Sequence, residues 1–416
     1  MSGTATVKGG GKVKSGGGSS GKKTQKALNK ASKGFSSTNI MKSPTDKPVK
    51  GKFNVYNFKP TKGEVFKLPY LAQAVVLTGK ADAKVVGHSG PNVELIVTDQ
   101  GHDTVNAAGG IGTIIGNGPD TISTNSPGKA GGNLLIQTSH PSVINMYGAS
   151  VTVQGNGDTV NVLSGTNNLV AQGGEVVHVG AGLSASLNLT DHGQTEKVTL
   201  GGNDTVTVTG GKDSITGTGT NQIKLAGGAT DTIHGNVQVT ITDGASYNLS
   251  VSGHDTLSFG SGQDTIVLHG AASVKGSAGD VLFRDFKGTA SVAAGSGDST
   301  LIGGAGNDTF TGSAGLVSMQ GGKGANVFQG GTGHDTMVAG GTSNLFSFYE
   351  GKSGGTHVIH GFKNGPDHLN LVGYDTAAAL AGAHVVGGNT VISLDSGHTT
   401  ITLVGFTHLT AASFGT

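Results

Sequence analysis

Hydrophobic and polar residues alternate in short runs from about residue 53 onward, and glycine-rich turns separate these runs. The segments "VTVQGNGDTVNVL", "KVTLGGNDTVTVTGG" and "VQVTITDG" show the alternation, and valine, isoleucine and threonine predominate in them. A period of two is typical of β-strands with one buried and one exposed face. Strands this short and this regularly punctuated predict a repeat architecture, and no stretch of this body predicts an amphipathic helix.

The repeat has a length of nine residues. An aspartate followed by threonine or serine and then a large apolar residue occurs ten times, at Asp103, Asp120, Asp158, Asp204, Asp213, Asp231, Asp255, Asp264, Asp308 and Asp335. Toward the end of the body, apolar residues recur at intervals of nine, at Val274, Phe283, Val292, Leu301, Phe310, Met319, Phe328, Met337 and Phe346. We therefore expect each nonapeptide to give a turn and a short strand, with these apolar side chains in a thin core. Two nonapeptides then make one coil of 18 residues.

The turns carry glycine and aspartate in a pattern suited to calcium. The nonapeptides from residue 303 read "GGAGNDTFT", "GSAGLVSMQ", "GGKGANVFQ", "GGTGHDTMV" and "AGGTSNLFS". Glycines permit positive φ and let carbonyl groups converge, and calcium prefers six to eight oxygen ligands. The predicted metal site residues are Gly303, Gly304, Gly306, Asp308, Asn326, Gly330, Gly331, Gly333, Asp335 and Asn344.

The sixth position of successive nonapeptides departs from a full set of carboxylates. One side of the roll is expected to stack Asp308, Asn326 and Asn344, and the other Val317 beneath Asp335. Because neither side has two aspartates in adjacent coils, we expect one or two weak sites, near the millimolar end of the usual range. The alternative is that these aspartates only form turns, through hydrogen bonds to their own backbone.

Residues 303–346 resemble the hemolysin-type, or RTX, calcium-binding repeat of bacterial secreted proteins. The segment "THVIHGFKNGPDHLNLVGYD" (356–375) resembles the element that closes such rolls, although His360-Gly361 replaces the usual acidic residue. The tail over residues 389–414 resembles the end that type I secretion systems read. The resemblance implies export through type I secretion machinery in the unfolded state, then calcium-assisted folding outside a bacterial cell.

Composition and charge further limit the class of protein to which this chain can belong. The chain has 76 glycines, 13% charged residues, no cysteine and no tryptophan, so it has neither disulfides nor the side chains for a wide core. No apolar run is long enough for a membrane helix, and no N-terminal secretory signal is readable. Residues 1–52 hold twelve lysines and one acid, Asp46, and they predict a disordered basic arm. That arm is either a solvated tail or a binder of anionic polymer, with surface polysaccharide favoured over nucleic acid.

A catalytic domain is not expected. The acids between residues 53 and 300 lie mainly at turns, the one arginine is Arg284, and no zinc motif occurs. His357 and His360 point to opposite faces of a strand, so a shared metal is not expected. His102, His254 and His334 precede repeat aspartates at turn positions that face solvent.

The predicted fold is all-β: an elongated parallel β-solenoid with an RTX-type roll and a C-terminal β cap. The expected segments are a basic arm (1–52), degenerate repeats (53–280), the nonapeptide roll (281–350), and the cap with the secretion signal (351–416). The expected function is that of a secreted calcium-binding structural protein of the cell surface or matrix, with self-assembly in calcium as a further hypothesis. The alternatives are a polysaccharide-active enzyme, such as a β-helical lyase or epimerase, and an anionic-polymer binding module.

Overall fold

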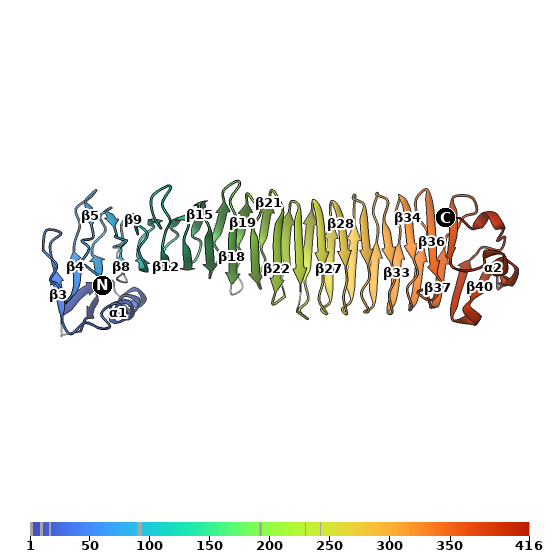
Figure 1. Cartoon of the computed structure of the whole chain (residues 1–416), viewed down its shortest axis with the longest axis horizontal. Coiled ribbons are helices and arrows are strands. Elements are labelled where there is room, and N and C mark those ends of the chain that lie inside the picture. The colour runs from blue at the N-terminus through green and yellow to red at the C-terminus, as the bar shows by residue number, and fades with distance from the viewer. Residues whose placement is uncertain are drawn as a thin grey trace. The chain divides into compact units, whose positions relative to one another are not determined.

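The structure, a computed structural model, describes residues 3–8, 11–15, 18–89, 94–190, 194–228, 230–241 and 243–415. The chain forms two compact units, residues 1–221 and 222–416. In each unit short parallel strands enter two sheets alternately, so that strands adjacent in a sheet are two apart in sequence (Figure 1). Each unit is therefore a parallel β-solenoid, as the alternating pattern predicts.

Unit 1 contains two solenoid sheets. The first comprises β3 (Thr38–Met41), β4 (Phe53–Phe58), β6 (Ala74–Leu77), β8 (Glu94–Val97), β10 (Gly112–Gly116), β12 (Asn133–Thr138), β14 (Ser150–Gln154), β16 (Asn167–Ala171), β18 (Ala185–Thr190) and β20 (Thr205–Thr209). The second comprises β5 (Val65–Lys67), β7 (Lys84–Val86), β9 (Thr104–Asn106), β11 (Thr121–Ser123), β13 (Val143–Tyr147), β15 (Thr159–Ser164), β17 (Val176–Val179), β19 (Lys197–Leu200) and β21 (Ser214–Gly217). Alternate side chains of these strands fill the narrow space between the sheets.

The disordered arm expected over residues 1–52 is not what the structure shows. Strands β1 (Gly3–Thr6) and β2 (Lys12–Ser15) form an antiparallel pair, and helix α1 (Gly18–Ala31) follows them. Val13 and Leu28 are fully buried against Phe53 and Val55 on the outer face of the first sheet. The physical reason is that β4, β6 and β8 carry apolar side chains on both faces, so this outer face needs a cover.

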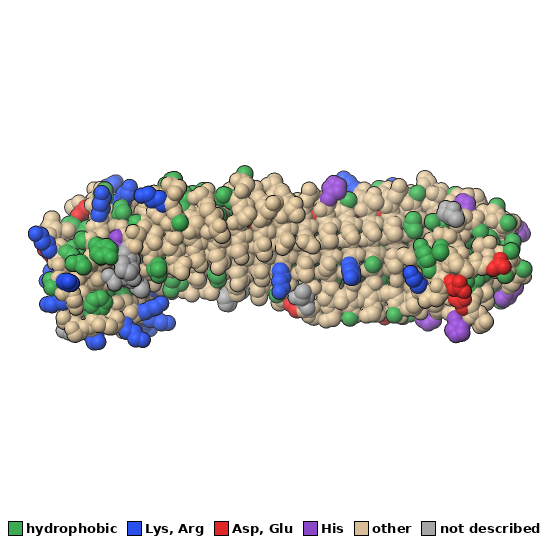
Figure 2. All heavy atoms as spheres, viewed as in Figure 1, with side chains coloured by type: hydrophobic (Ala, Val, Ile, Leu, Met, Phe, Trp, Pro, Cys, Tyr) green, Lys and Arg blue, Asp and Glu red, His purple; other side chains and the backbone are tan. Residues whose placement is uncertain are grey.

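Lysine side chains lie on the outside of this N-terminal cover. Residues 1–84 hold seventeen lysines and three acids, Asp46, Glu64 and Asp82. On the face that Figure 2 shows, the lysines gather at the N-terminal end of the unit. The basic segment is thus a folded cap with a cationic surface.

Unit 2 repeats the two-sheet plan. Its first sheet comprises β22 (Asn221–Ala226), β24 (Val237–Ile241), β26 (His254–Ser258), β28 (Ala271–Lys275), β30 (Ala290–Ala293), β32 (Thr309–Thr311), β34 (Ala325–Gln329), β36 (Ser343–Tyr349) and β38 (Asp367–Val372). Its second comprises β23 (Thr230–His234), β25 (Asn248–Ser252), β27 (Asp264–Leu268), β29 (Val281–Asp285), β31 (Ser299–Ile302), β33 (Leu316–Gln320), β35 (His334–Val338), β37 (Gly355–His360) and β41 (Thr399–Val404).

The nine-residue apolar series forms the core of unit 2. All nine of its members, from Val274 to Phe346, are at most 2% exposed. Phe310, Phe328 and Phe346 lie in the first sheet one coil apart, with ring centroids 6.1 and 4.9 Å from one another. Burial of these large rings at each coil offsets the loss of backbone entropy on ordering short strands.

The C-terminal segment closes unit 2 with strands and one helix. β39 (His384–Val386), β40 (Asn389–Leu394) and β41 form an antiparallel meander, and β41 pairs with β37 in parallel. Helix α2 (Thr376–Gly382) begins after Asp375, whose carboxylate accepts hydrogen bonds from two amides of its first turn. Two 3-10 turns, η1 (Asp395–Gly397) and η2 (Ala411–Ser413), complete the segment. The β cap expected for residues 351–416 therefore also contains a helix.

Candidate calcium sites

The predicted site residues fall on two edges of unit 2, because successive nonapeptides turn toward alternate edges. Asp308, Asn326 and Asn344 lie in register on adjacent strands of the first sheet, before or at the start of β32, β34 and β36. Gly303, Gly304 and Gly306 form the turn that leads to Asp308. Gly330, Gly331 and Gly333 lead to Asp335 at the opposite edge, where Val317 and Asp335 are paired.

Hydrogen bonds close the Asp308 edge. Asp308 accepts the N–H of Ala290 in the preceding coil (2.8 Å) and that of Gly304 in its own turn (3.2 Å). Asn326 accepts the N–H of Asp308 (2.9 Å), and its amide group donates to Asn344 (3.4 Å). Each buried polar group in this stack therefore has a partner from the protein, and calcium would have to replace hydrogen bonds here.

Burial also changes the acidity of Asp308. Its pKa is raised to about 6, mainly by desolvation, and the nearby carboxylate of Asp285 adds to the rise. The N–H groups of Ala290 and Gly304 act in the opposite direction and lower it. The raised value means that an ionised Asp308 lacks full compensation from its surroundings.

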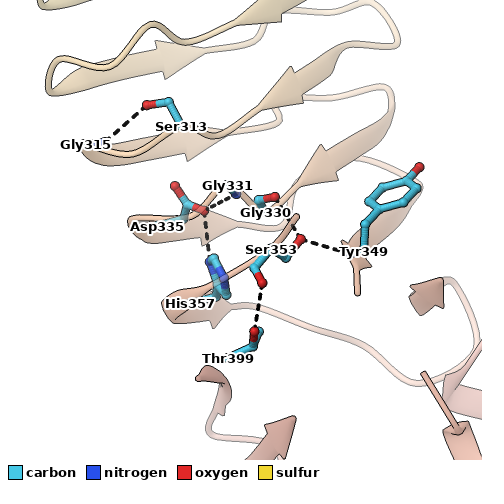
Figure 3. Close-up of polar contacts among 9 residues, drawn as sticks. All are labelled: Ser313, Gly315, Gly330, Gly331, Asp335, Tyr349, Ser353, His357 and Thr399. Carbon is cyan, nitrogen blue, oxygen red and sulfur yellow. Dashed lines mark hydrogen bonds and ion pairs between the residues drawn. The ribbon is translucent and has the colours of Figure 1, made fainter. Parts of the chain in front are cut away.

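At the edge that contains Asp335, one oxygen of the Asp335 carboxylate has no hydrogen-bond partner among the described residues (Figure 3). Asp335 Oδ2 accepts the N–H of Gly331 (2.9 Å) and lies 2.9 Å from Nδ1 of His357, whose side chain is fully buried. Asp335 Oδ1 is buried without a hydrogen-bond partner among the described residues. A Cβ at Gly312, in the turn on the same edge one coil earlier, would lie 2.7 Å from both carboxylate oxygens.

This arrangement fits calcium at one carboxylate. An unpartnered carboxylate oxygen beside glycine turns supplies the hard oxygen donors that the ion prefers, and backbone carbonyls can complete the set. Residues that would hold calcium here are Asp335 and the turn glycines Gly330, Gly331 and Gly333. In the part of the chain that the structure describes, no three His, Cys, Asp or Glu side chains form a metal cluster. Carbonyl ligands would therefore have to predominate.

The glycines are needed for a reason other than the one predicted. Gly303, Gly304 and Gly306 do not adopt positive φ. Instead, a Cβ at Gly306 would collide with the carbonyl oxygen of Gly288, one coil earlier. A Cβ at Gly333 would collide with Gly315 in the same manner. Close stacking of coils, and not left-handed backbone, selects glycine at these positions.

Sequence reasoning missed two residues of these edges. His357 is paired with Asp335 in the next coil, and Asp367 extends the other stack by accepting a hydrogen bond from Asn344 (2.8 Å). The interval from Asp335 to His357 is 22 residues rather than 18, so the nine-residue period did not reach it. His360 is exposed while His357 is buried, which agrees with the predicted opposite faces. His102, His254 and His334 are exposed, also as predicted.

Ser353 lies near His357 (Figure 3), and its hydrogen bonds are structural. Its hydroxyl donates to the carbonyl of Gly330 (3.0 Å) and accepts the N–H of Tyr349 (2.9 Å). Its own carbonyl accepts the hydroxyl of Thr399 (2.9 Å). Ser353 thus fastens the loop between β36 and β37 to the roll and to β41.

Comparison with known proteins identifies the repeat. The RTX calcium-binding nonapeptide repeat matches residues 198–221, 252–266, 288–315 and 318–346. A comparison with curated proteins found no match. Proteins with this repeat bind calcium and are generally secreted. Among the described helices, none is long and apolar enough to cross a membrane. Four segments of the β-solenoid therefore match the RTX calcium-binding nonapeptide repeat.

Proposed function

We propose that this protein is a calcium-ordered structural protein of a bacterial cell surface or extracellular matrix, of the biofilm, surface-layer or adhesin type. The observation that supports the proposal is that RTX nonapeptides form coils of a solenoid in which buried aspartates such as Asp204, Asp255 and Asp335 each keep one carboxylate oxygen without a hydrogen-bond partner among the described residues. Calcium outside the cell would neutralise these groups as the coils stack. Export through type I secretion machinery is part of the same proposal.

Circular dichroism during a calcium titration tests the folding step. The full chain, started in chelator, is expected to gain strand signal as calcium approaches millimolar concentrations. The variant Asp335→Asn should need more calcium, whereas Glu350→Asn, at an exposed acid, should respond as the wild type does. A strand spectrum that is the same in chelator and in calcium would show that calcium does not drive folding of this chain.

Assembly is tested separately under the same conditions. Sedimentation velocity and electron microscopy with and without calcium would show whether folded chains associate with one another. Binding to bacterial cells or their exopolysaccharide would support a surface role. Protein that folds with calcium but neither associates nor binds would contradict the matrix and adhesin role.

The folded cationic cap favours a second function, binding of anionic surface polysaccharide. Lys22, Lys26 and Lys30 lie exposed on α1, so a polyanion can reach several of them at once. Electrostatic attraction of this kind weakens as salt screens the charges. Binding of alginate should fall on changing these three residues to glutamine and should fall with added salt. Lys323→Gln in unit 2 serves as the control, and equal loss there would refute a specific role of the cap.

A further inference from the structure

The second sheet of unit 2 ends in a strand with one open edge. β39 pairs with β40 in antiparallel fashion, and among the described residues no other strand pairs with it. Gly387 and Gly388, both with positive φ, form the two-residue turn that joins β39 to β40. Turns of this kind fix the register of the two strands. The N–H and C=O groups on the other edge of β39 are therefore held in position for a further strand.

The side chains of β39 do nothing to protect this edge. Val385 and Val386 are 54% and 55% exposed, and His384 is exposed as well. Successive side chains of a strand point to opposite faces, so both faces of β39 are exposed. Proteins usually protect an edge strand with lysine, proline or a bulge. β39 has none of these, and it is apolar, as a strand that pairs with another chain would be.

The direction of β39 determines which strand can continue the sheet. β37 and β41 are parallel, and β40 is antiparallel to both β41 and β39. β39 therefore runs in the same direction as the solenoid strands of its sheet. A second copy placed end to end in the same orientation would present its own second sheet with the strands running in this direction. Its first strand in that sheet is β5.

β5 also has an open edge. It pairs with β7 alone among the described strands, and Val65 is 56% exposed. The carbonyl of Glu64 accepts the N–H of Lys84 (2.8 Å), and the N–H of Leu68 donates to the carbonyl of Val86 (2.7 Å). Because backbone groups alternate in direction along a strand, those of Val65 and Lys67 point away from β7.

The charges at the two edges favour pairing of β39 with β5 over pairing of β39 with itself. β5 lies within residues 1–84, which hold seventeen lysines and three acids. After Lys363 the sequence has three acids, Asp367, Asp375 and Asp395, and no lysine or arginine. On the face shown in Figure 2, acidic and histidine side chains lie at the C-terminal end of unit 2. Unlike charges attract across an interface, whereas two copies of the same end repel each other.

We propose that β39 of one copy pairs in parallel with β5 of a second copy, so that the second sheet continues from one chain to the next. The proposal rests on the structural role proposed above and identifies the partner as this chain itself. Because the two edges are different surfaces, each copy can bind one neighbour at each edge. Contacts of this head-to-tail type produce open chains of copies, or rings where the rotation closes.

Thiol cross-linking of the full chain tests the pairing directly, because the sequence has no cysteine of its own. Val65→Cys, Val385→Cys and the double variant are folded in calcium and treated with a short bismaleimide. The double variant should give a ladder of covalent multimers, and each single variant should stay monomeric. Dimers of Val385→Cys alone would show that β39 pairs with itself and would overturn the proposal. A ladder that also forms when Leu163→Cys, at an exposed position of β15, replaces Val65→Cys would show random collision and would overturn it too.

Sedimentation velocity in calcium measures how strongly the copies associate. Val385→Lys places a positive charge against the cationic end of the next copy and should abolish the rise of the sedimentation coefficient with protein concentration. Val385→Glu should retain more of this rise, since its charge is opposite to that of the partner. If β39 paired with itself, both variants would lose association equally, because like charges would face each other in each. Circular dichroism confirms that the variants are folded, and Leu163→Lys should associate as the wild type does.

The outcomes separate this pairing from the structural role on which it rests. Wild type that associates equally well with and without Val385→Lys would overturn the pairing and leave the structural role standing. Wild type that folds with calcium but stays monomeric at every concentration would also overturn the pairing. Binding to cells or exopolysaccharide would then decide the structural role.

Discussion

Glu94 gives a sharp prediction about stability and pH. It begins β8 and is 2% exposed; its Oε1 accepts the N–H of His88 (2.6 Å), while Oε2 has no hydrogen-bond partner among the described residues. A Cβ at Gly110 would lie 2.8 Å from Oε2, 2.7 Å from the carbonyl oxygen of His88 and 3.1 Å from that of Ala107. Oε2 therefore lies in a buried place bordered by carbonyl oxygens, where no described N–H group compensates an ionised carboxylate, so the protonated form is favoured.

Burial accordingly raises the pKa of Glu94 from 4.5 to about 7, and the His88 N–H only partly opposes the rise. Below pH 4.5 the acid is protonated in both the folded and the unfolded chain. As the pH rises toward 7 the unfolded chain ionises first, so the folded state binds more protons and the free energy of unfolding falls. At about 1.4 kcal/mol for each pH unit, the full loss is about 3 kcal/mol.

Glu94→Gln should abolish this pH dependence, because glutamine is neutral at every pH and its amide can donate to the carbonyl groups. Repeat proteins need not unfold in one step, so the assay is native-state hydrogen exchange of peptides from β8 and β10 in chelator, corrected for intrinsic exchange rates. Between pH 5 and 8 the opening free energy of wild type should fall, and that of the variant should stay level. Glu350→Gln should behave as wild type. If the opening free energy fell equally with pH in wild type and in Glu94→Gln, Glu94 would not be the cause of the pH dependence.

Three further changes test unit 2. His357→Asp puts a second carboxylate against Asp335, so the variant should melt lower than wild type in chelator and bind one more calcium by calorimetry; unchanged stoichiometry would contradict the carboxylate-pairing argument. Phe328→Ala removes a ring from the middle of the phenylalanine stack and should lower the free energy of unfolding by about 3–5 kcal/mol in urea titrations; a loss below about 1 kcal/mol would mean that the core repacks. Gly306→Ala should destabilise through collision with the preceding coil, whereas Gly382→Ala, with no atom near its Cβ position, should be neutral or slightly stabilising in thermal melts. Similar effects of the two alanines would show that coil spacing does not select glycine.

The core of unit 2 could be predicted because periodicity alone determines it. Residues nine apart, such as Phe310 and Met319, fall at equivalent places in the two sheets when a coil has 18 residues. The same count predicts that Phe310 and Phe328 stack, and their rings do so. Because this stacking depends only on the length of a coil, irregular turns do not change which apolar residues meet.

The N-terminal cover could not be predicted from its own composition. Helix α1 buries Leu28 but is otherwise rich in lysine, glycine and serine, and such a segment normally cannot offset its ordering entropy. The sequence signal for a cover lies in two strands of the solenoid, "AVVL" (74–77) and "ELIV" (94–97). Their consecutive apolar residues do not alternate with polar ones, so both faces of these strands need burial. The local pattern of a strand does not show which distant segment covers its second face, because that depends on tertiary packing.

The candidate sites show a related limit of consensus patterns. Stacking brings the same position of successive coils together, so a carboxylate's stability depends on the residue one coil away. One coil after Asp308 lies Asn326, which accepts the main-chain N–H of Asp308, while the Asp308 carboxylate itself accepts the N–H groups of Ala290 and Gly304. One coil after Asp335 lies His357, whose Nδ1 is 2.9 Å from Oδ2 of Asp335. Glu175, in a turn outside the segments that match the nonapeptide, lies between Asp158 and Glu196 of the neighbouring coils, and neither of its carboxylate oxygens has a hydrogen-bond partner in the part of the chain that the structure describes. Of the two conforming turns, that of Asp335 has the greater need of a cation, because its Oδ1 is buried without a hydrogen-bond partner among the described residues, and we expect the calcium dependence of unit 2 to rest on it more than on Asp308.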